Sequence, residues 1–415
     1  MNPLASRFLA VRRRSAELIA PLSAEDCCAQ SMPDASPAKW HLAHTTWFFE
    51  TFLLEPYEPG FRAFCPAFRV LFNSYYNGVG AKHPRPQRGL LTRPALAEVL
   101  AWRANVQERM VALLEQRAAD AAFCALVELG LQHEQQHQEL LLTDLLHLFS
   151  CNPTLPAYRE APPALAVSAA AKLDWVQFPG GMGEFGHQGA GFCFDNELPR
   201  HASYLAPYAL GARLVNNGEY AAFIEAGGYR TPEWWLAEGW DWLAAQQIHH
   251  PLYWRAAPGG GWHAFGLHGE LPLELNAPVA HLSYFEADAY ARWAGARLPT
   301  EAEWEAAAAP LAERLLAASE AGRTRLAAQA ASGNGLRELF GEVWQWTQSS
   351  YAPYPGFRAP PGAVGEYNGK FMVNQYVLRG SSCATPAGHA RLSYRNFFPT
   401  SARWQFTGLR LARNL

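Results

Sequence analysis

The segment 127–149 carries two histidines at a spacing that restricts how the chain around it can fold and what it can bind. Apolar residues recur along it with the period of an α-helix, and His133 and His137 lie four residues apart within it. Residues at i and i+4 share one helix face, so both imidazoles point the same way. Two neutral imidazoles form half of a site for Zn, Cu, Fe or Ni. The alternative is a solvated face of His, Gln and Glu, and the pair alone does not decide.

A third histidine for such a site lies far upstream, in Trp40-His-Leu-Ala-His44. The first 150 residues contain four apolar-periodic segments separated by prolines: 8–22, 38–54, 94–116 and 120–149. Four long helices predict a bundle, and bundles build metal sites from side chains on facing helices. A histidine of the second helix is therefore expected to meet the pair on the fourth.

The composition excludes several classes of function. The chain is 49% hydrophobic and 17% charged, with a net charge of −3 and no basic tail, so nucleic acid is not an expected partner. It begins without an apolar signal core and has no apolar run of about 18 residues, so we expect a cytoplasmic protein without membrane contact. The 7 cysteines form no C-x-x-C pair, which argues against a disulfide framework or a thiolate zinc site.

The sequence changes character after about residue 150. Residues 151–172 are rich in Pro and then Ala and predict a linker. Beyond them Gly, Pro and Trp become frequent, and the segments become short. Helices are expected at 217–226 and 284–294, with short strands and long loops elsewhere. We therefore expect an α plus α+β chain, with a helical bundle in 1–150 and an α+β domain in 173–415.

Motifs of the second half resemble those of the formylglycine-generating enzymes, also called sulfatase-modifying factors. The similar stretches are 278–305, Gly341-Glu-Val-Trp-Gln-Trp-Thr347, Leu378-Arg-Gly-Ser-Ser382 and Phe406-Thr-Gly-Leu-Arg-Leu-Ala412. The resemblance implies a C-type-lectin-like α+β scaffold with little regular structure. Those enzymes use a copper-binding Cys pair, whereas Cys193 and Cys383 stand alone here, which argues against oxidation of a protein cysteine as the activity.

The first half, with its His-x3-His-x-Glu pattern, resembles the DinB-type four-helix bundle. The two domains in this order are similar to the ergothioneine-biosynthesis sulfoxide synthases. Further motifs similar to that family are Ser74-Tyr-Tyr-Asn-Gly-Val-Gly80, His83-Pro-Arg-Pro-Gln-Arg-Gly-Leu-Leu91, Gly365-Glu-Tyr-Asn-Gly-Lys-Phe-Met372 and Tyr394-Arg-Asn-Phe-Phe-Pro399. The family implies a mononuclear non-haem Fe(II) enzyme. It uses O2 to couple a thiol, cysteine or γ-glutamylcysteine, to C2 of the imidazole of hercynine (Nα-trimethylhistidine), giving a sulfoxide.

The resemblance implies that His44, His133 and His137 are the iron ligands. His44 occupies the Leu-Ala-His position of the family pattern, so we assign it in preference to His41. His41 would then be a structural group or one that supports a ligand. Three histidines leave coordination positions for O2, the sulfur donor and the imidazole.

The resemblance also implies roles for polar residues of the first half. Tyr76 and Tyr75 match a Tyr pair that supplies a proton beside the iron, and we favour this role for one of them; the alternative is aromatic packing under a loop. Gln136 resembles the Gln that hydrogen-bonds the hercynine imidazole; the alternative is a solvated helix position. Arg85 and Arg88 match a loop that holds a carboxylate of the thiol substrate, and an Arg fork suits a carboxylate. The alternative is that they are ordinary surface arginines.

Residues of the second half are expected at the substrate as well. Trp344, Trp346, Phe397 and Phe398 could wall a pocket for the quaternary ammonium of hercynine, which aromatic faces attract. The alternative is ordinary core packing, which we favour for at least two of the four. Glu342 stands where many relatives carry Asn and could contact the ammonium or carboxylate of hercynine.

Three rivals to this interpretation differ in chemistry. A selenoneine-type synthase joins a selenosugar to hercynine, but a sugar donor does not need the Arg pair. An ovothiol-type synthase acts on C5 of histidine and usually carries a methyltransferase domain, which these residues lack. A non-catalytic lectin-like binding module would not need the histidine set, and fold analogy alone does not decide between them.

Overall fold

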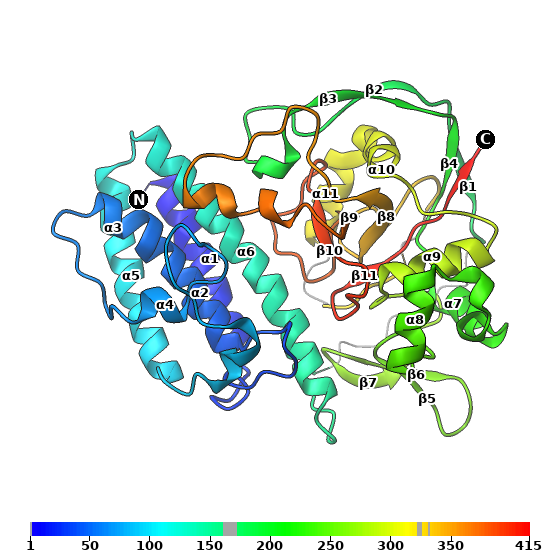
Figure 1. Ribbon diagram of the computed structural model, residues 1–415, viewed down its shortest axis with the longest axis horizontal. Helices are drawn as coiled ribbons and strands as arrows, with labels where there is room; N and C mark the ends of the chain where they lie inside the picture. The colour runs from blue at the N-terminus through cyan, green and yellow to red at the C-terminus, as the bar shows by residue number, and fades with distance from the viewer. Residues whose placement is uncertain (1, 161–171, 322–325, 331–332) are drawn as a thin grey trace. The chain divides into compact units, whose positions relative to one another are not determined.

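The computed structural model spans residues 1–415 and describes all of them except 1, 161–171, 322–325 and 331–332 (Figure 1). Most of the linker expected at 151–172 therefore lies outside the described residues. The chain forms two compact units. The first comprises Met1–Arg159 together with the distant segment Pro360–Tyr367, and the second comprises Glu160–Ala359 and Asn368–Leu415.

The first unit is the expected helical bundle, so this part of the fold class is confirmed. Its long helices are α1 (Pro3–Ile19), α2 (Ala38–Phe49), α5 (Leu96–Gln116) and α6 (Ala121–Ser150). Helix α2 packs against α5 and α6, and α1 packs against the same two helices. Shorter elements connect them: the π-helical turn η1 (Glu50–Leu54), α3 (Glu55–Tyr57), α4 (Phe68–Leu71) and the 3-10 turn η2 (Arg85–Leu90).

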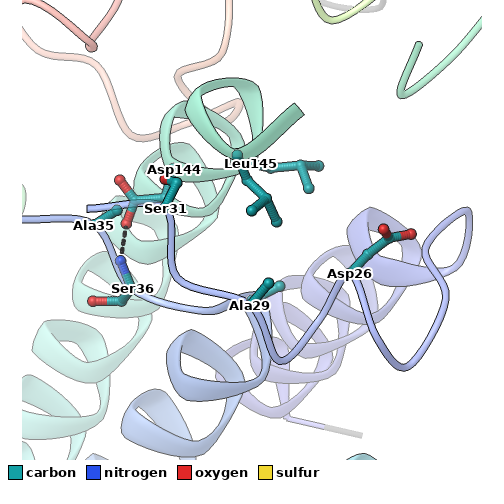
Figure 2. A pocket seen from close by; sticks show the side chains of 9 residues that line it. Asp26, Ala29, Ser31, Ala35, Ser36, Asp144 and Leu145 are labelled. Atoms are coloured by element: carbon teal, nitrogen blue, oxygen red, sulfur yellow. Dashed lines mark hydrogen bonds between the residues drawn. The ribbon is translucent and has the colours of Figure 1, made fainter. Parts of the chain in front are cut away.

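Local hydrogen bonds fix where these helices begin. The Asp120 carboxylate accepts from the N–H of Phe123 and caps α6. The Asn2 side chain caps α1 through the N–H of Leu4, so this helix starts earlier than its apolar pattern indicates. Near α2, the N–H of Ser36 donates to the Asp144 carboxylate of α6 at 2.7 Å (Figure 2). This bond ties the start of α2 to the C-terminal half of α6.

The second unit is built from small sheets joined by long loops. A three-stranded sheet has the order β1 (Trp175–Phe178), β4 (Tyr208–Gly211), β12 (Ala412–Asn414), so its last strand comes from the end of the chain. A four-stranded sheet has the order β10 (Asn396–Pro399), β9 (Gln375–Gly380), β8 (Trp344–Ser350), β11 (Thr407–Gly408). Two small antiparallel sheets complete it: β2–β3 (Gly181–Phe185, His201–Leu205) and β5–β6–β7 (Trp254–Ala256, Trp262–Gly266, Gly269–Pro272).

The helices of the second unit are short. The two expected from the sequence are confirmed as α7 (Asn217–Glu225) and α9 (Tyr284–Trp293). Two more helices, α8 (Ala237–Gln246) and α10 (Glu301–Ala308), are not among those expected from the sequence, and α11 (Ala312–Ala321) follows α10. Mixed α and β content with much irregular chain is the fold class expected here. Among the described helices, none combines the length and apolarity that a bilayer crossing requires.

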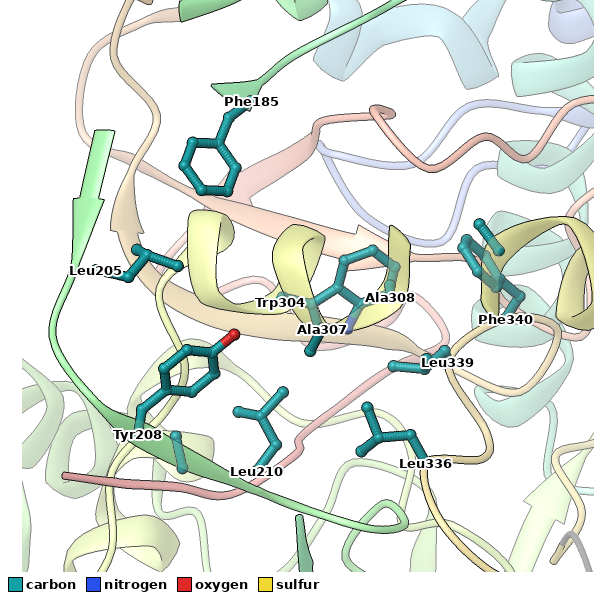
Figure 3. Packing of buried hydrophobic residues seen from close by; sticks show 12 residues of the cluster. Phe185, Leu205, Tyr208, Leu210, Trp304, Ala307, Ala308, Leu336, Leu339 and Phe340 are labelled. Carbon is teal, nitrogen blue, oxygen red and sulfur yellow. The ribbon is translucent and has the colours of Figure 1, made fainter. Parts of the chain in front are cut away.

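The core beside α10 packs around Trp304 (Figure 3). Trp304 is fully buried between Leu339, Phe340 and strand residues. Its Nε1 donates to the Gln345 amide oxygen at 2.9 Å, and Arg410 Nε donates to the same oxygen at 2.9 Å. Gln345 is 0% exposed, so its amide serves this core.

Candidate metal centre

The helical bundle brings three histidines to one point. His44 comes from α2, and His133 and His137 come from one face of α6. Each offers a ring nitrogen, and these three atoms all lie within 4.8 Å of one another. His44 and His133 are buried, and His137 is partly exposed. Because the donors come from two packed helices, their convergence depends on the bundle and not on the i,i+4 spacing alone.

Hydrogen bonding leaves ring nitrogens of this cluster available to a metal ion. His44 Nδ1 donates to the Phe72 carbonyl at 2.7 Å, which puts its proton on Nδ1 and the lone pair on Nε2. Within the described part of the chain, His44 Nε2 and both nitrogens of His133 are buried without a hydrogen-bond partner. Buried polar atoms without a partner cost free energy and need an explanation. Coordination of a divalent metal would satisfy them, so the residues present fit a metal site.

Burial also keeps the three imidazoles in the form that binds metal. Desolvation lowers the pKa of His133 to about 3. It lowers the pKa of His44 and His137 well below the usual value as well, with further lowering from the neighbouring His133. Neutral imidazole is the ligating form. Burial therefore favours three neutral imidazoles at neutral pH.

His41 lies beside this cluster and contacts one member of it. Its Nδ1 is 2.8 Å from His137 Nδ1, and its Nε2 is 3.1 Å from Asp144 Oδ2. Both ring nitrogens of His41 thus have a polar partner, whereas His44 Nε2 has no hydrogen-bond partner among the described residues. This geometry favours His44 over His41 as the third ligand.

An aromatic and cationic layer covers His44. Trp40 and Trp47 both stack on its ring, at centroid distances of 4.6 Å and 5.5 Å. The Arg88 guanidinium lies 3.4 Å over the Trp40 ring and donates to Ser36 Oγ at 2.9 Å. Burial lowers the pKa of Arg88 to about 9.

The two arginines expected at the thiol substrate have different settings. Arg88 is 4% exposed and also donates to Ser74 Oγ at 3.3 Å, so its fork is used within the bundle. Arg85 is exposed and donates to the Asp34 carbonyl. The carboxylate-binding role of either residue stays a prediction.

The tyrosine pair contacts Trp47, the indole that stacks on His44. Tyr76 is fully buried against Trp47 (5.4 Å), Phe52 (5.2 Å) and Tyr75 (4.6 Å). Burial raises the pKa of Tyr76 well above its usual value, with a further contribution from Tyr75. These ring contacts are those of a packed aromatic, and the proton-donor role of the pair stays a prediction.

A third tyrosine, for which the sequence predicts no role, contacts a histidine of the cluster directly. Tyr367 belongs to the segment Pro360–Tyr367 of the first unit, and its ring is edge-on to His133 at 5.6 Å between centroids. Its hydroxyl donates to the Gln136 amide oxygen. The only sequence signal was its place in the Gly365-Glu-Tyr-Asn motif. Tyr367 and Gln136 therefore form a polar pair beside the candidate metal ligands.

The neighbouring Glu366 anchors this tyrosine. Its carboxylate accepts from the N–H of Asn77 at 3.0 Å and from the N–H of Gly78 at 2.6 Å. Position 78 is constrained, since a Cβ there would lie 2.9 Å from Glu366 Oε1. The loop that carries the Tyr75–Tyr76 pair thus holds the segment that carries Tyr367.

The residues nominated in the second unit have separate surroundings. Trp344 packs against Tyr394 (5.2 Å), and Trp346 Nε1 donates to the Leu282 carbonyl at 2.9 Å; both indoles are buried, as core residues are. The remaining three are half-buried: Phe397 stacks on Tyr351 at 4.0 Å, Phe398 lies near Trp404, and Glu342 accepts from the N–H of Gln329. Contact of these residues with a substrate stays a prediction.

Comparisons with known proteins agree with this architecture. Residues 7–141 match the DinB superfamily, and residues 164–325 and 313–415 match the sulfatase-modifying factor enzyme 1-like domain. These matches define a class of protein in which a DinB bundle precedes a sulfatase-modifying-factor-like domain.

Full-length relatives narrow the class further. The chain is 34% identical to "Hercynine oxygenase" of Mycolicibacterium thermoresistibile, over 99% of this chain and 94% of the relative. It is 32% identical to "Hercynine oxygenase" of Mycobacterium tuberculosis, over 99% and 98%. "Ergothioneine biosynthesis protein 1" of Schizosaccharomyces pombe is 27% identical over 54% of this chain and 28% of its own length. The chain belongs to the hercynine oxygenase family and is an enzyme of the oxidoreductase class.

Proposed function

We propose that this enzyme is a non-haem Fe(II)- and O2-dependent sulfoxide synthase that joins a thiol to C2 of the hercynine imidazole. The observation that carries the proposal is the convergence of His44, His133 and His137 in the bundle of a hercynine oxygenase relative. Full-length similarity to proteins named hercynine oxygenase supports hercynine as one substrate.

The three histidines would hold one iron ion. His44 would bind through Nε2, because its Nδ1 donates to the Phe72 carbonyl. Imidazole suits iron, and three protein ligands leave open positions for small molecules. When bound, the iron supplies the activation of O2 and a site for the donor sulfur. The bundle's part is to hold three neutral imidazoles at fixed positions in a largely buried pocket.

Gln136 and Tyr367 would act on the substrates directly. Gln136 directly precedes the candidate ligand His137 on α6 and is partly buried. Its amide can therefore hold the hercynine imidazole next to the metal. The Tyr367 hydroxyl, hydrogen-bonded to Gln136 and beside His133, is in position to deliver a proton during coupling. A positioned proton donor contributes about 100- to 10,000-fold. Tyr75 and Tyr76 remain the second candidates for this role.

Aromatic side chains would recognise hercynine, and a charged side chain would recognise the thiol. The half-buried rings of Phe397 and Phe398 can attract the trimethylammonium of hercynine. Exposed Arg85 can pair with a carboxylate of cysteine or γ-glutamylcysteine.

The test is a coupling assay with the full chain. Protein loaded anaerobically with Fe(II) receives hercynine and O2 together with cysteine, γ-glutamylcysteine or a selenosugar in parallel reactions, and products are identified by mass spectrometry. We expect a hercynine–thiol sulfoxide, and no product from metal-free protein or from His44→Ala. Iron-loaded protein that yields no coupled product with any donor would overturn the proposal. Coupling to the selenosugar alone would overturn the assignment of a thiol donor.

A further inference from the structure

A chain of three side chains extends from the metal centre into the bundle. His137 Nδ1 lies 2.8 Å from His41 Nδ1, and His41 Nε2 lies 3.1 Å from Asp144 Oδ2. His41 is 3% exposed and Asp144 is 6% exposed. His137 and Asp144 both belong to α6, and His41 reaches between them from α2. The chain therefore bridges the two helices that carry the metal ligands.

The chemistry of the chain sets the direction of its hydrogen bonds. A carboxylate only accepts, so His41 carries a proton on Nε2 and donates it to Asp144. In this tautomer His41 has a lone pair on Nδ1, which accepts from the Nδ1–H of His137. With its proton on Nδ1, His137 presents the lone pair of Nε2. One carboxylate thus selects the tautomer of two successive imidazoles.

The far end of the chain is itself fixed. Asp144 Oδ2 also accepts from the backbone N–H of Ser36 at 2.7 Å, just before α2. The carboxylate borders a small pocket lined in part by Asp26, Ser31 and Leu145 (Figure 2). Because a backbone group holds the acceptor, the chain can transmit a fixed orientation to the ring of His137.

We propose that His41 and Asp144 are positioning residues that hold His137 with Nε2 directed at the metal. The inference rests on the proposed metal centre and adds a role for two residues outside the ligand set. It parallels His44, whose Nδ1 proton is held by the Phe72 carbonyl. Partners of this kind fix the tautomer and orientation of a ligating imidazole, and their loss typically weakens metal binding about 10- to 100-fold.

Metal affinity of the full chain tests the proposal without any turnover. Cobalt(II) is added anaerobically to metal-free protein, and its dissociation constant is measured by competition with a chelator while the visible spectrum reports the ligand geometry. His41→Leu removes the acceptor for His137 and should weaken binding about 10- to 100-fold with an altered spectrum. His41→Asn places an amide oxygen close to the position of His41 Nδ1 and should restore most of the affinity. Asp144→Ala should weaken binding in the same direction as His41→Leu.

A matched control lies on the same helix. His147 follows Asp144 by one turn of α6, and its Nδ1 contacts Ser31 Oγ at 2.7 Å. Because this contact leads to Ser31 and not to His41 or His137, His147→Gln should bind cobalt like the wild type. Thermal unfolding of the metal-free variants separates lost affinity from lost folding.

Two results would overturn the inference. One is a His41→Leu variant that is folded and has the affinity and spectrum of the wild type. The other is a His41→Leu variant that loses binding as completely as His44→Ala, because His41 would then be a ligand itself. Failure of the proposed function is seen separately, as tight metal binding by the wild type without coupled product.

Discussion

Glu134 follows the candidate ligand His133 and is the centre of a buried charge cluster in the bundle. Its carboxylate accepts from Arg12 at 3.1 Å, from Ser15 Oγ at 2.6 Å and from Arg103. The Glu134 side chain is 1% exposed, and those of the two arginines are 0% and 6% exposed. Replacing Glu134 by glutamine keeps the shape of the side chain but leaves two buried guanidinium groups without a counter-charge.

The pKa of Glu134 gives the size of the expected loss. Burial acts to raise this pKa, but the charges of Arg103 and Arg12 and the hydrogen bonds from Arg103 and Ser15 outweigh it and lower the pKa to about 2 from 4.5. At about 1.4 kcal/mol per pKa unit, the ionised carboxylate contributes about 3–4 kcal/mol to stability. Loss of one partner from a buried ion pair typically costs about 3–5 kcal/mol, which agrees.

The sign of the pH dependence follows from the lowered pKa. The contribution is fully present above the unfolded-state pKa near 4.5 and is lost as the pH falls from there towards 2. The wild type and Glu134→Gln should therefore differ most at neutral pH, and the difference should shrink below about pH 4.5.

Amide hydrogen exchange along α6 measures this loss without assuming that both units unfold together. Glu134→Gln should lower the opening free energy of these amides by about 3–5 kcal/mol at pH 7. Glu128→Gln is the matched control on the same helix, because its pairing with Arg7 is partly exposed and should contribute less than about 1 kcal/mol. A Glu134→Gln effect no larger than that of the control would refute the reasoning.

Three further changes probe other parts of the chain. Tyr367→Phe should leave iron binding intact, lower sulfoxide formation about 100-fold or more and raise the share of thiol oxidised to sulfinic acid; a product ratio that shifts only in Tyr76→Phe would contradict this. Gly365→Ala should shift the ratio the same way, since a Cβ there would lie 1.8 Å from the Pro360 carbonyl oxygen; an unchanged ratio would count against that segment's role. Glu305→Gln should destabilise the second unit by about 3–5 kcal/mol, because its arginine partner is fully buried; calorimetry with an unshifted transition would argue otherwise.

The long helices and the histidine cluster were within reach of the sequence because their signals are local. The helical period and the i,i+4 spacing of His133 and His137 are properties of one segment, and only the meeting of α2 with α6 required a rule about bundles. The class of fold and the family resemblance are likewise confirmed by the domains and relatives. The short helices are harder to predict from the sequence, although the Thr300-x-x-Glu303 capping box indicates the start of α10.

The features that the sequence did not predict depend on contacts between distant parts of the chain. Tyr367 meets His133 because Glu366 binds two backbone amides of a loop far upstream. Arg88 is buried and stacks on the ring of Trp40. No local sequence pattern distinguishes such an arginine from an exposed one. The bridge from His41 to Asp144 likewise forms only when α2 and α6 pack.

Anomalous diffraction at the iron edge, from crystals of the Fe(II)-loaded protein grown without O2, tests the central claim most directly. We expect one ordered iron per chain, bound by the Nε2 atoms of His44 and His137 and by a nitrogen of His133. His41 should be hydrogen-bonded to His137 without touching the metal. An iron ion bound by His41 in place of His44, or located away from these three histidines, would contradict the account.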